Sequence, residues 1–97
     1  MRLEIDDHSP LTDSLAYEFE RMCRERCGVH IDQIDSSRDA SLRAQEIVLS
    51  AAGTHCVLYL GGWDVHNCQY PWQILEKLYR QAEPWLEDLP TARRDGY

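Results

Sequence analysis

The sequence predicts an α/β fold: a small, three-stranded and mostly parallel sheet with three helices. Three short apolar runs have the composition of strands. The residues between them repeat apolar side chains at three- and four-residue spacing, which is typical of helices. The resulting order is β-α-β-α-β-α, with connections short enough for right-handed crossovers. An α+β arrangement with one antiparallel strand stays open. At 97 residues, we expect residues 1–97 to form a single domain.

The strands are predicted at residues 2–6, 29–34 and 56–61. Each apolar run ends in a polar cluster, and these clusters are Asp6-Asp7-His8-Ser9, Asp35-Ser36-Ser37-Arg38 and Gly61-Gly62-Trp63-Asp64. In open parallel α/β sheets, ligands meet the protein beyond the carboxyl ends of the strands. If the three strands are parallel neighbours, the polar clusters share one edge, and that edge is the place to look for function.

The first helix is predicted at residues 11–27. It follows Ser9-Pro10, a serine that can cap the helix and a proline at its first position, and Gly28 ends it. Its apolar stripe consists of Leu11, Leu15, Phe19, Met22, Cys23 and Cys27. Because Cys23 and Cys27 share this stripe, we expect reduced, largely buried thiols there.

Two more helices are predicted at residues 38–52 and 71–82. Ser36 or Ser37 caps the earlier one and Gly53 closes it, and its buried side is Ala40, Ala44, Ile47, Val48 and Ala51. The later one begins at Pro71, with a stripe of Trp72, Leu75, Leu78, Tyr79 and Ala82. Pro84 predicts a separate final turn over residues 85–89, and the tail 91–97 is expected to be flexible.

The charge balance limits the partners. Seventeen acidic residues against ten basic ones give a net charge of −7. Nucleic acid and anionic membranes repel such a chain, so we expect no direct binding to either. No run approaches the length of apolar sequence that spans a bilayer. The acidic N-terminus has no signal-peptide core, which predicts a cytoplasmic protein with four free thiols.

Aromatic side chains gather within residues 63–72, in and just after a stretch from Gly61 to Pro71 that the spacing predicts to be a loop. They are Trp63, His66, Tyr70 and Trp72. Tyrosine and tryptophan are enriched at binding hot spots, and long loops in small domains are often functional. We expect Trp72 to pack on the sheet, which leaves Trp63 and Tyr70 as anchors for a partner.

Several arrangements of reactive residues stay open as alternatives. A zinc site could draw on Cys23, Cys27, His30, His55, Cys56, His66 and Cys68, although their spacing matches no known finger or ribbon. A nucleophile and base could come from His8 with Ser9, or from His66 with Cys68. Gly61-Gly62 after a strand resembles a phosphate-binding turn but lacks the fuller glycine pattern, and a tight turn explains the two glycines equally well. None of these patterns is specific to one reaction, so we predict no catalytic residue, no metal and no cofactor.

The segment Asp6-Asp7-His8-Ser9-Pro10-Leu11 follows a predicted strand and precedes Leu15. With it, residues 2–20 resemble the start of a response-regulator receiver domain. In that family an acidic pair holds magnesium beside a phosphoaccepting aspartate at the end of the third strand. Asp6 and Asp7 match the metal-binding pair. The third strand here ends in Leu60-Gly61-Gly62-Trp63, with Asp64 displaced, so the phosphoacceptor is absent.

The sequence therefore predicts a small acidic, non-catalytic module that docks on a basic protein partner. Its partner-binding residues would be Asp6, Asp7, Asp35, Asp64, Trp63 and Tyr70. An inhibitor or nucleic-acid-mimicking decoy of the phage anti-defence kind, such as an anti-CRISPR protein, is one concrete form. The alternatives are a small nucleotide- or phosphate-binding enzyme or degenerate receiver-like regulator using the strand-end edge, and a structural subunit. Small sheets with uncovered edges often pair, so a homodimer is also possible.

Overall fold

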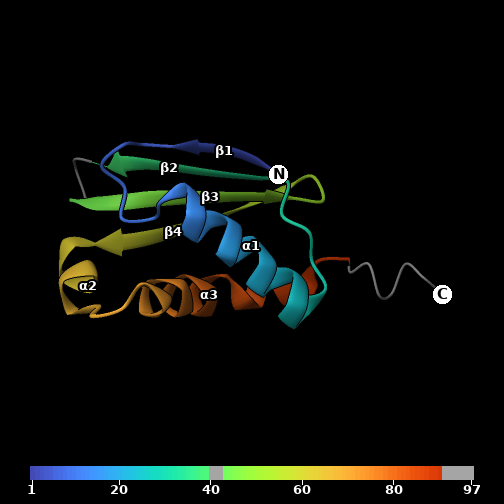
Figure 1. The fold of residues 1–97 in the computed structure, drawn as a ribbon. Helices are drawn as coiled ribbons and strands as arrows, with labels where there is room; N and C mark the ends of the chain where they lie inside the picture. Colours follow the sequence, from blue (N-terminus) through green and yellow to red (C-terminus); the bar gives the residue numbers. More distant parts are fainter. Residues whose placement is uncertain (40–42, 91–97) are drawn as a thin grey trace.

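A computed structural model describes residues 1–39 and 43–90 of the chain. The described part contains four strands and three helices, which confirms the α/β class (Figure 1). In chain order they are β1 (Arg2–Ile5), α1 (Asp13–Cys27), β2 (Gln33–Asp39), β3 (Ala44–Ala51), β4 (Thr54–Gly61), α2 (Gly62–Asn67) and α3 (Pro71–Asp88). The predicted flexible tail 91–97 lies outside the described residues.

The sheet is mixed, in the order β1-β2-β3-β4. β1 and β2 are parallel, whereas β3 is antiparallel to both β2 and β4. The prediction of three mostly parallel strands is therefore wrong in detail. However, β1, β2 and β4 point in the same direction, because β3 reverses the chain between β2 and β4. The carboxyl ends of the three strands that the sequence predicted consequently lie at the same end of the sheet.

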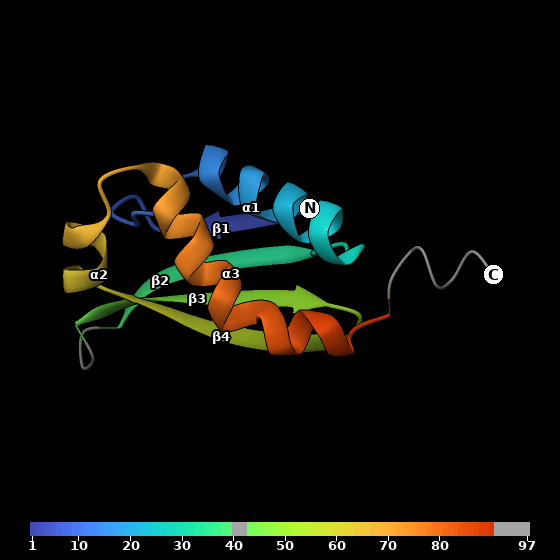
Figure 2. The ribbon, with the colours of Figure 1, turned by 90° about the horizontal axis from the view of Figure 1, so that it is seen from below.

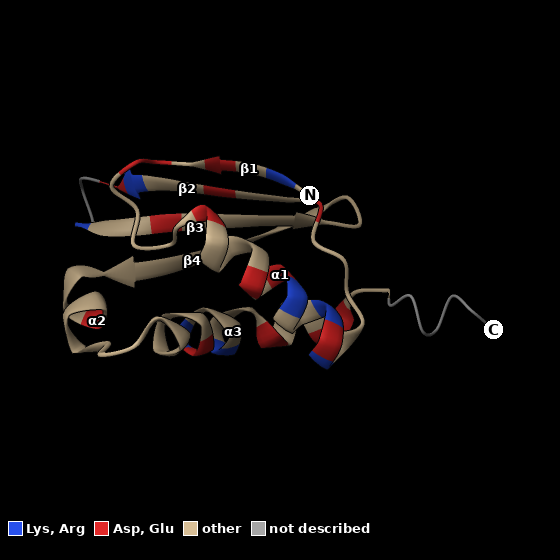
Figure 3. Cartoon of the chain, in the orientation of Figure 1, with Lys and Arg blue, Asp and Glu red and all other residues tan. Residues whose placement is uncertain are grey.

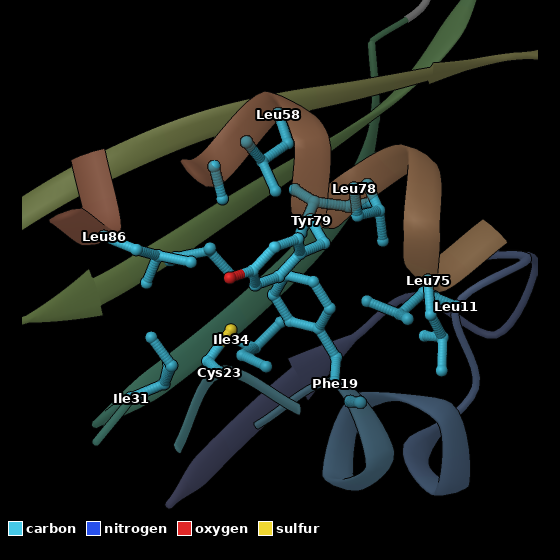
Figure 4. Packing of buried hydrophobic residues seen from close by; sticks show 14 of the residues in the cluster. Leu11, Phe19, Cys23, Ile31, Ile34, Leu58, Leu75, Leu78, Tyr79 and Leu86 are labelled. Carbon is cyan, nitrogen blue, oxygen red and sulfur yellow. The ribbon is translucent and has the colours of Figure 1, made fainter. Parts of the chain in front are cut away.

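The molecule has two layers. Helices α1 and α3 lie over the same face of the sheet, and no described helix lies over the other (Figures 1 and 2). Phe19 reaches from α1 into the apolar cluster between the layers, where Leu58 of β4 and Leu78 of α3 are also fully buried (Figure 4). Burying each side chain of this size stabilises the fold by about 1.5–3 kcal/mol.

The helix predicted at residues 38–52 is wrong. Residues 38–39 complete β2 and residues 44–51 form β3. The side chains of β3 alternate between the two faces of the sheet, with Gln45, Ile47, Leu49 and Ala51 buried. The apolar residues of this segment fit both the 3.6-residue period of a helix and the two-residue period of a strand. Pairing with β2 on one side and β4 on the other favours the strand.

Gly53, which was predicted to end that helix, belongs to a hairpin turn between β3 and β4. Ala52 has φ 51° and Gly53 has φ 75°, while Ala51 pairs with Thr54. Positive φ at both central residues is characteristic of a type I′ turn, whose twist suits antiparallel strands. The turn therefore fixes the β3–β4 register.

The other boundaries differ by a few residues. α1 starts at Asp13 rather than residue 11, because the Thr12 hydroxyl accepts a hydrogen bond from the Leu15 N–H at 3.3 Å. β2 begins at Gln33, four residues after the predicted start at Val29, since its pairing with β1 starts opposite Arg2. The end of α1 at Gly28, which has φ 68°, is as predicted.

α3 continues through Pro84, so the separate final turn is wrong. A proline inside a helix removes one backbone hydrogen bond, at a cost of about 3 kcal/mol. Tertiary contacts on both sides of it offset this cost. Ala82 and Leu86 are fully buried, and the Trp85 indole N–H donates to the Thr54 hydroxyl at 2.8 Å.

The outer edge of β4 is protected by α3. The Gln81 side chain accepts a hydrogen bond from the Tyr59 backbone N–H at 3.0 Å and donates one to the Tyr59 carbonyl at 2.9 Å. The glutamine amide thus occupies the place of a neighbouring strand, which blocks edge-to-edge pairing.

We expect Gln81→Ala to lower the free energy of unfolding by about 1–2 kcal/mol, because two hydrogen bonds are lost. It should also promote self-association through the freed β4 edge. Urea denaturation and sedimentation velocity measure the two effects, with the exposed Gln69→Ala as control. A Gln81→Ala protein as stable and as monomeric as the control would contradict this role.

Candidate functional site

A pocket of about 300 Å³ lies at the end of the sheet where β1, β2 and β4 terminate. Its floor is a row of paired residues on the helix-covered side: Arg38 of β2, Gln45 of β3 and Leu60 of β4. The connection after β1 forms one wall and α2 forms another. We call it the strand-end pocket, and it is lined by His8, Pro10, Arg38, Arg43, Ala44, Gln45, Leu60, Gly62 and Val65.

Each of the three polar clusters seen in the sequence contributes a residue to this pocket. His8 comes from the cluster after β1, Arg38 from β2, and Gly62 from the start of α2. The clusters therefore do meet at one edge, but through their basic and neutral members rather than through the predicted aspartates.

A buried hydrogen-bond network supports this end of the sheet. The hydroxyls of Ser9 and Ser36 are 2.7 Å apart, and the Gln45 side-chain amide donates to the Ser36 hydroxyl at 3.0 Å. The Leu11 backbone N–H donates to the Ser9 hydroxyl at 3.1 Å. Ser9 therefore ties the β1–α1 connection to β2 instead of capping a helix, and this structural role occupies its hydroxyl.

The structure does not bring the four predicted aspartates together: Asp6 and Asp7 stay neighbours, whereas Asp35 and Asp64 lie elsewhere. Asp6 and Asp7 line a neighbouring hollow of about 220 Å³ beside the start of α1, and the Asp6 carboxylate accepts a hydrogen bond from the His8 backbone N–H at 2.9 Å. Asp64 accepts the Gly61 N–H at 3.1 Å and lies 3.7 Å from the Lys77 ammonium. Asp35 lies in the middle of β2, where the Gln33 amide donates to its carboxylate.

The predicted aromatic loop is partly helical, because residues 62–67 form α2. Trp63 is 74% exposed and stacks on His66, with ring centroids 6.0 Å apart. Tyr70 stacks on Trp72 at 6.5 Å. Trp72 is 59% exposed, so the prediction that it packs on the sheet is wrong. We call Trp63, His66, Tyr70 and Trp72 the aromatic corner.

The uncovered side of the sheet is the other large surface, and we call it the open sheet face. One row of paired residues runs across all four strands: Glu4, Asp35, Val48 and Val57. In a further row, Glu46 pairs with Tyr59. Val57 is 45% exposed and Tyr59 is 41% exposed. Carboxylates on β1, β2 and β3 thus flank an apolar strip along β4 (Figure 3).

Sequence reasoning missed most of this face. Val57 and Tyr59 were predicted to lie in an apolar strand, and neither was assigned to a face. They alternate with Leu58 and Leu60, and this period of two places them on the opposite face. Glu46 was placed in a helix. Arg38 was predicted only as a member of the polar cluster after the second strand and Arg43 was not singled out, because the hairpin that brings them together was not predicted.

The cysteines have free thiols. Cys23 is fully buried, and burial raises the pKa of its thiol to about 12. Cys27 is only half-buried, and its sulfur lies 2.9 Å from the Tyr79 hydroxyl. Across residues 1–39 and 43–90, no group of three or more His, Cys, Asp or Glu side chains is arranged to hold a metal ion.

No known family model matches the chain, and no curated protein or solved structure is significantly similar to it. The resemblance of residues 2–20 to a receiver domain therefore stays a prediction. Within the described part of the chain, no helix has the length and apolar character needed to cross a membrane.

Proposed function

We propose that this protein is a non-catalytic binding module that docks on a protein partner with a basic surface. The observation that supports this most strongly is the open sheet face. Exposed apolar side chains of β4 lie there beside carboxylates of the other three strands. Apolar contacts hold protein complexes together, while complementary charges direct their formation.

The chemistry of this face supports the kind of partner that we propose. Glu4, Asp35 and Glu46 are acidic, and the cation beside them, Arg2, is already paired with Glu4 at 3.5 Å. The matching surface would carry an apolar centre next to lysine or arginine side chains. A basic nucleic-acid-binding protein has such a surface, so an inhibitor or decoy that blocks it is the specific form of the proposal.

The aromatic corner supplies a second contact surface in this proposal. Trp63 and Tyr70 were predicted as anchors, and both are exposed. The separation of the predicted aspartates means that one flat interface would not include all six predicted residues. The experiment must therefore distinguish the open sheet face from the aromatic corner.

The test is a kinetic measurement on a partner isolated from the host with the immobilised chain and then purified. We expect Glu46→Gln to slow association and Tyr59→Ala to speed dissociation, the latter by at least tenfold if its loss costs about 2 kcal/mol. The on-rate should fall as NaCl rises from about 50 to 500 mM, because salt screens the carboxylates.

Matched controls come from α1. Glu18→Gln and Tyr17→Ala alter the same residue types on an exposed helix surface and should leave both rates unchanged. If only Trp63→Ala and Tyr70→Ala speed dissociation, the aromatic corner is the docking surface. Equal effects of control and open-face variants, or a salt-independent on-rate, would contradict steering by this face. Self-association abolished by Tyr59→Ala would identify a second copy as the occupant.

A further inference from the structure

We propose that the strand-end pocket binds the phosphate group of a small organic phosphomonoester. The pocket lies on the helix-covered side of the sheet, away from the open sheet face, so this inference is independent of the proposed docking function. It rests on the cations, the volume and the walls of the pocket.

The two arginines of the pocket are available to a ligand. Most other described cations already face a carboxylate oxygen at 2.6–3.8 Å, namely Arg2, Arg21, Arg24, Arg26 and Lys77. Within residues 1–39 and 43–90, Arg38 and Arg43 make no such ion pair. Both are exposed and line the same pocket. Among the described residues, this acidic protein thus has two guanidinium groups without an ion pair beside one pocket.

The fold brings these arginines together. Arg38 is near the end of β2 and Arg43 immediately precedes β3, so the β2–β3 hairpin places them at neighbouring strand ends (Figure 3). Arg43 has φ 50°, a backbone conformation that is uncommon for residues other than glycine. No carboxylate is among the described residues that line this pocket, and Asp64 of the adjoining helix α2 accepts the Gly61 N–H and faces Lys77.

The chemistry favours a phosphate over a carboxylate. Guanidinium groups form paired hydrogen bonds with phosphate oxygens, and two of them match the charge of a dianion. His8 and the side-chain amide of Gln45 line the same pocket and add polar groups. The net charge of −7 opposes any anion, so affinity depends on these local groups rather than on the overall field.

The rest of the pocket fits an organic group attached to the phosphate. Its volume of about 300 Å³ is at the lower end of the range for small-molecule sites. Pro10, Leu60 and Val65 provide apolar wall. The buried Ser9, Ser36 and Gln45 network holds the floor and one wall in fixed positions. A preformed pocket loses less conformational entropy on binding.

The test is a titration of the full chain with AMP, adenosine and inorganic phosphate, followed by calorimetry and by amide shifts in ¹⁵N-labelled protein. We expect AMP to bind with a Kd below about 1 mM and to shift the amides of His8, Gln45 and Gly62. Adenosine should bind at least tenfold more weakly. Inorganic phosphate that binds as tightly as AMP would identify the free ion as the ligand source and still support the anion site.

Two variants and a matched control locate the effect. Arg38→Gln and Arg43→Gln should each weaken AMP binding at least tenfold, whereas Arg21→Gln, the same charge change on α1, should not. Because the pocket arginines are exposed and unpaired among the described residues, thermal unfolding of the variants should match that of the wild type. Absence of binding at about 10 mM AMP, equal binding of adenosine, or equal weakening by Arg21→Gln would overturn the proposal.

Discussion

Phe19→Ala is expected to lower the free energy of unfolding by about 3–5 kcal/mol, the largest effect of any single change considered for this protein. Phe19 is fully buried and projects from α1 into the cluster between the two layers (Figure 4). Removing the ring loses its burial and leaves a cavity that the sheet and α3 cannot close completely. A domain of this length has about 5–15 kcal/mol of stability, so this loss would remove a large part of the total.

Urea denaturation followed by circular dichroism measures this loss. The matched control is Tyr17→Ala, two residues earlier on the same helix, where the side chain is exposed. The control should change stability by no more than about 0.5 kcal/mol. A Phe19→Ala loss as small as that of the control would mean that α1 does not pack on the sheet as described.

Alkaline pH is expected to unfold the protein through buried groups that must lose a proton. Burial raises the pKa of the Cys23 thiol from its ordinary value of 9.0 to about 12. Burial also raises the pKa of Tyr79, whose hydroxyl contacts Cys27, and that of Cys56. Each group is easier to deprotonate in the unfolded chain than in the folded one.

The sign of the effect follows from proton binding. Between pH 9 and 12 the folded state keeps the Cys23 proton that the unfolded state has lost, so stability is complete below pH 9 and falls as pH rises through this range. For Cys23 alone the difference corresponds to about 4 kcal/mol. Urea denaturation at several pH values measures the slope.

Cys23→Ala provides the comparison, since alanine has no proton to lose. The variant should be less stable at neutral pH, because it leaves a small cavity, but its stability should fall less steeply above pH 9. Tyr79→Phe should flatten the slope further. Equal slopes in wild type and Cys23→Ala would contradict the assigned burial of this thiol.

The strongest local signals in the sequence correctly predicted the elements that depend on them. The 3.6-residue stripe from Leu15 to Cys27 and the glycine after it predicted α1. Pro71 and the stripe behind it predicted the start of α3, and the apolar run at residues 56–61 predicted most of β4. In each case, residues close together in the chain are enough to distinguish a helix from a strand.

The surfaces needed information from distant residues. Whether Ile47 and Val48 belong to a helix or a strand depended on β2 and β4, which form hydrogen bonds on either side of them. That choice placed Glu46 and Tyr59 together on the open sheet face, and it brought Arg38 and Arg43 to one end of the sheet.

The sequence by itself therefore determined the α/β class, the acidity and the helices with long amphipathic stripes. Only the tertiary structure decided the antiparallel β3, the uncovered face and the strand-end pocket. The physical reason is that a helix forms its hydrogen bonds within one segment, whereas a strand forms them with neighbours that the local sequence does not specify. The apolar residues of segment 44–51 fit both a helix and a strand, and its pairing with β2 and β4 decides that it is a strand.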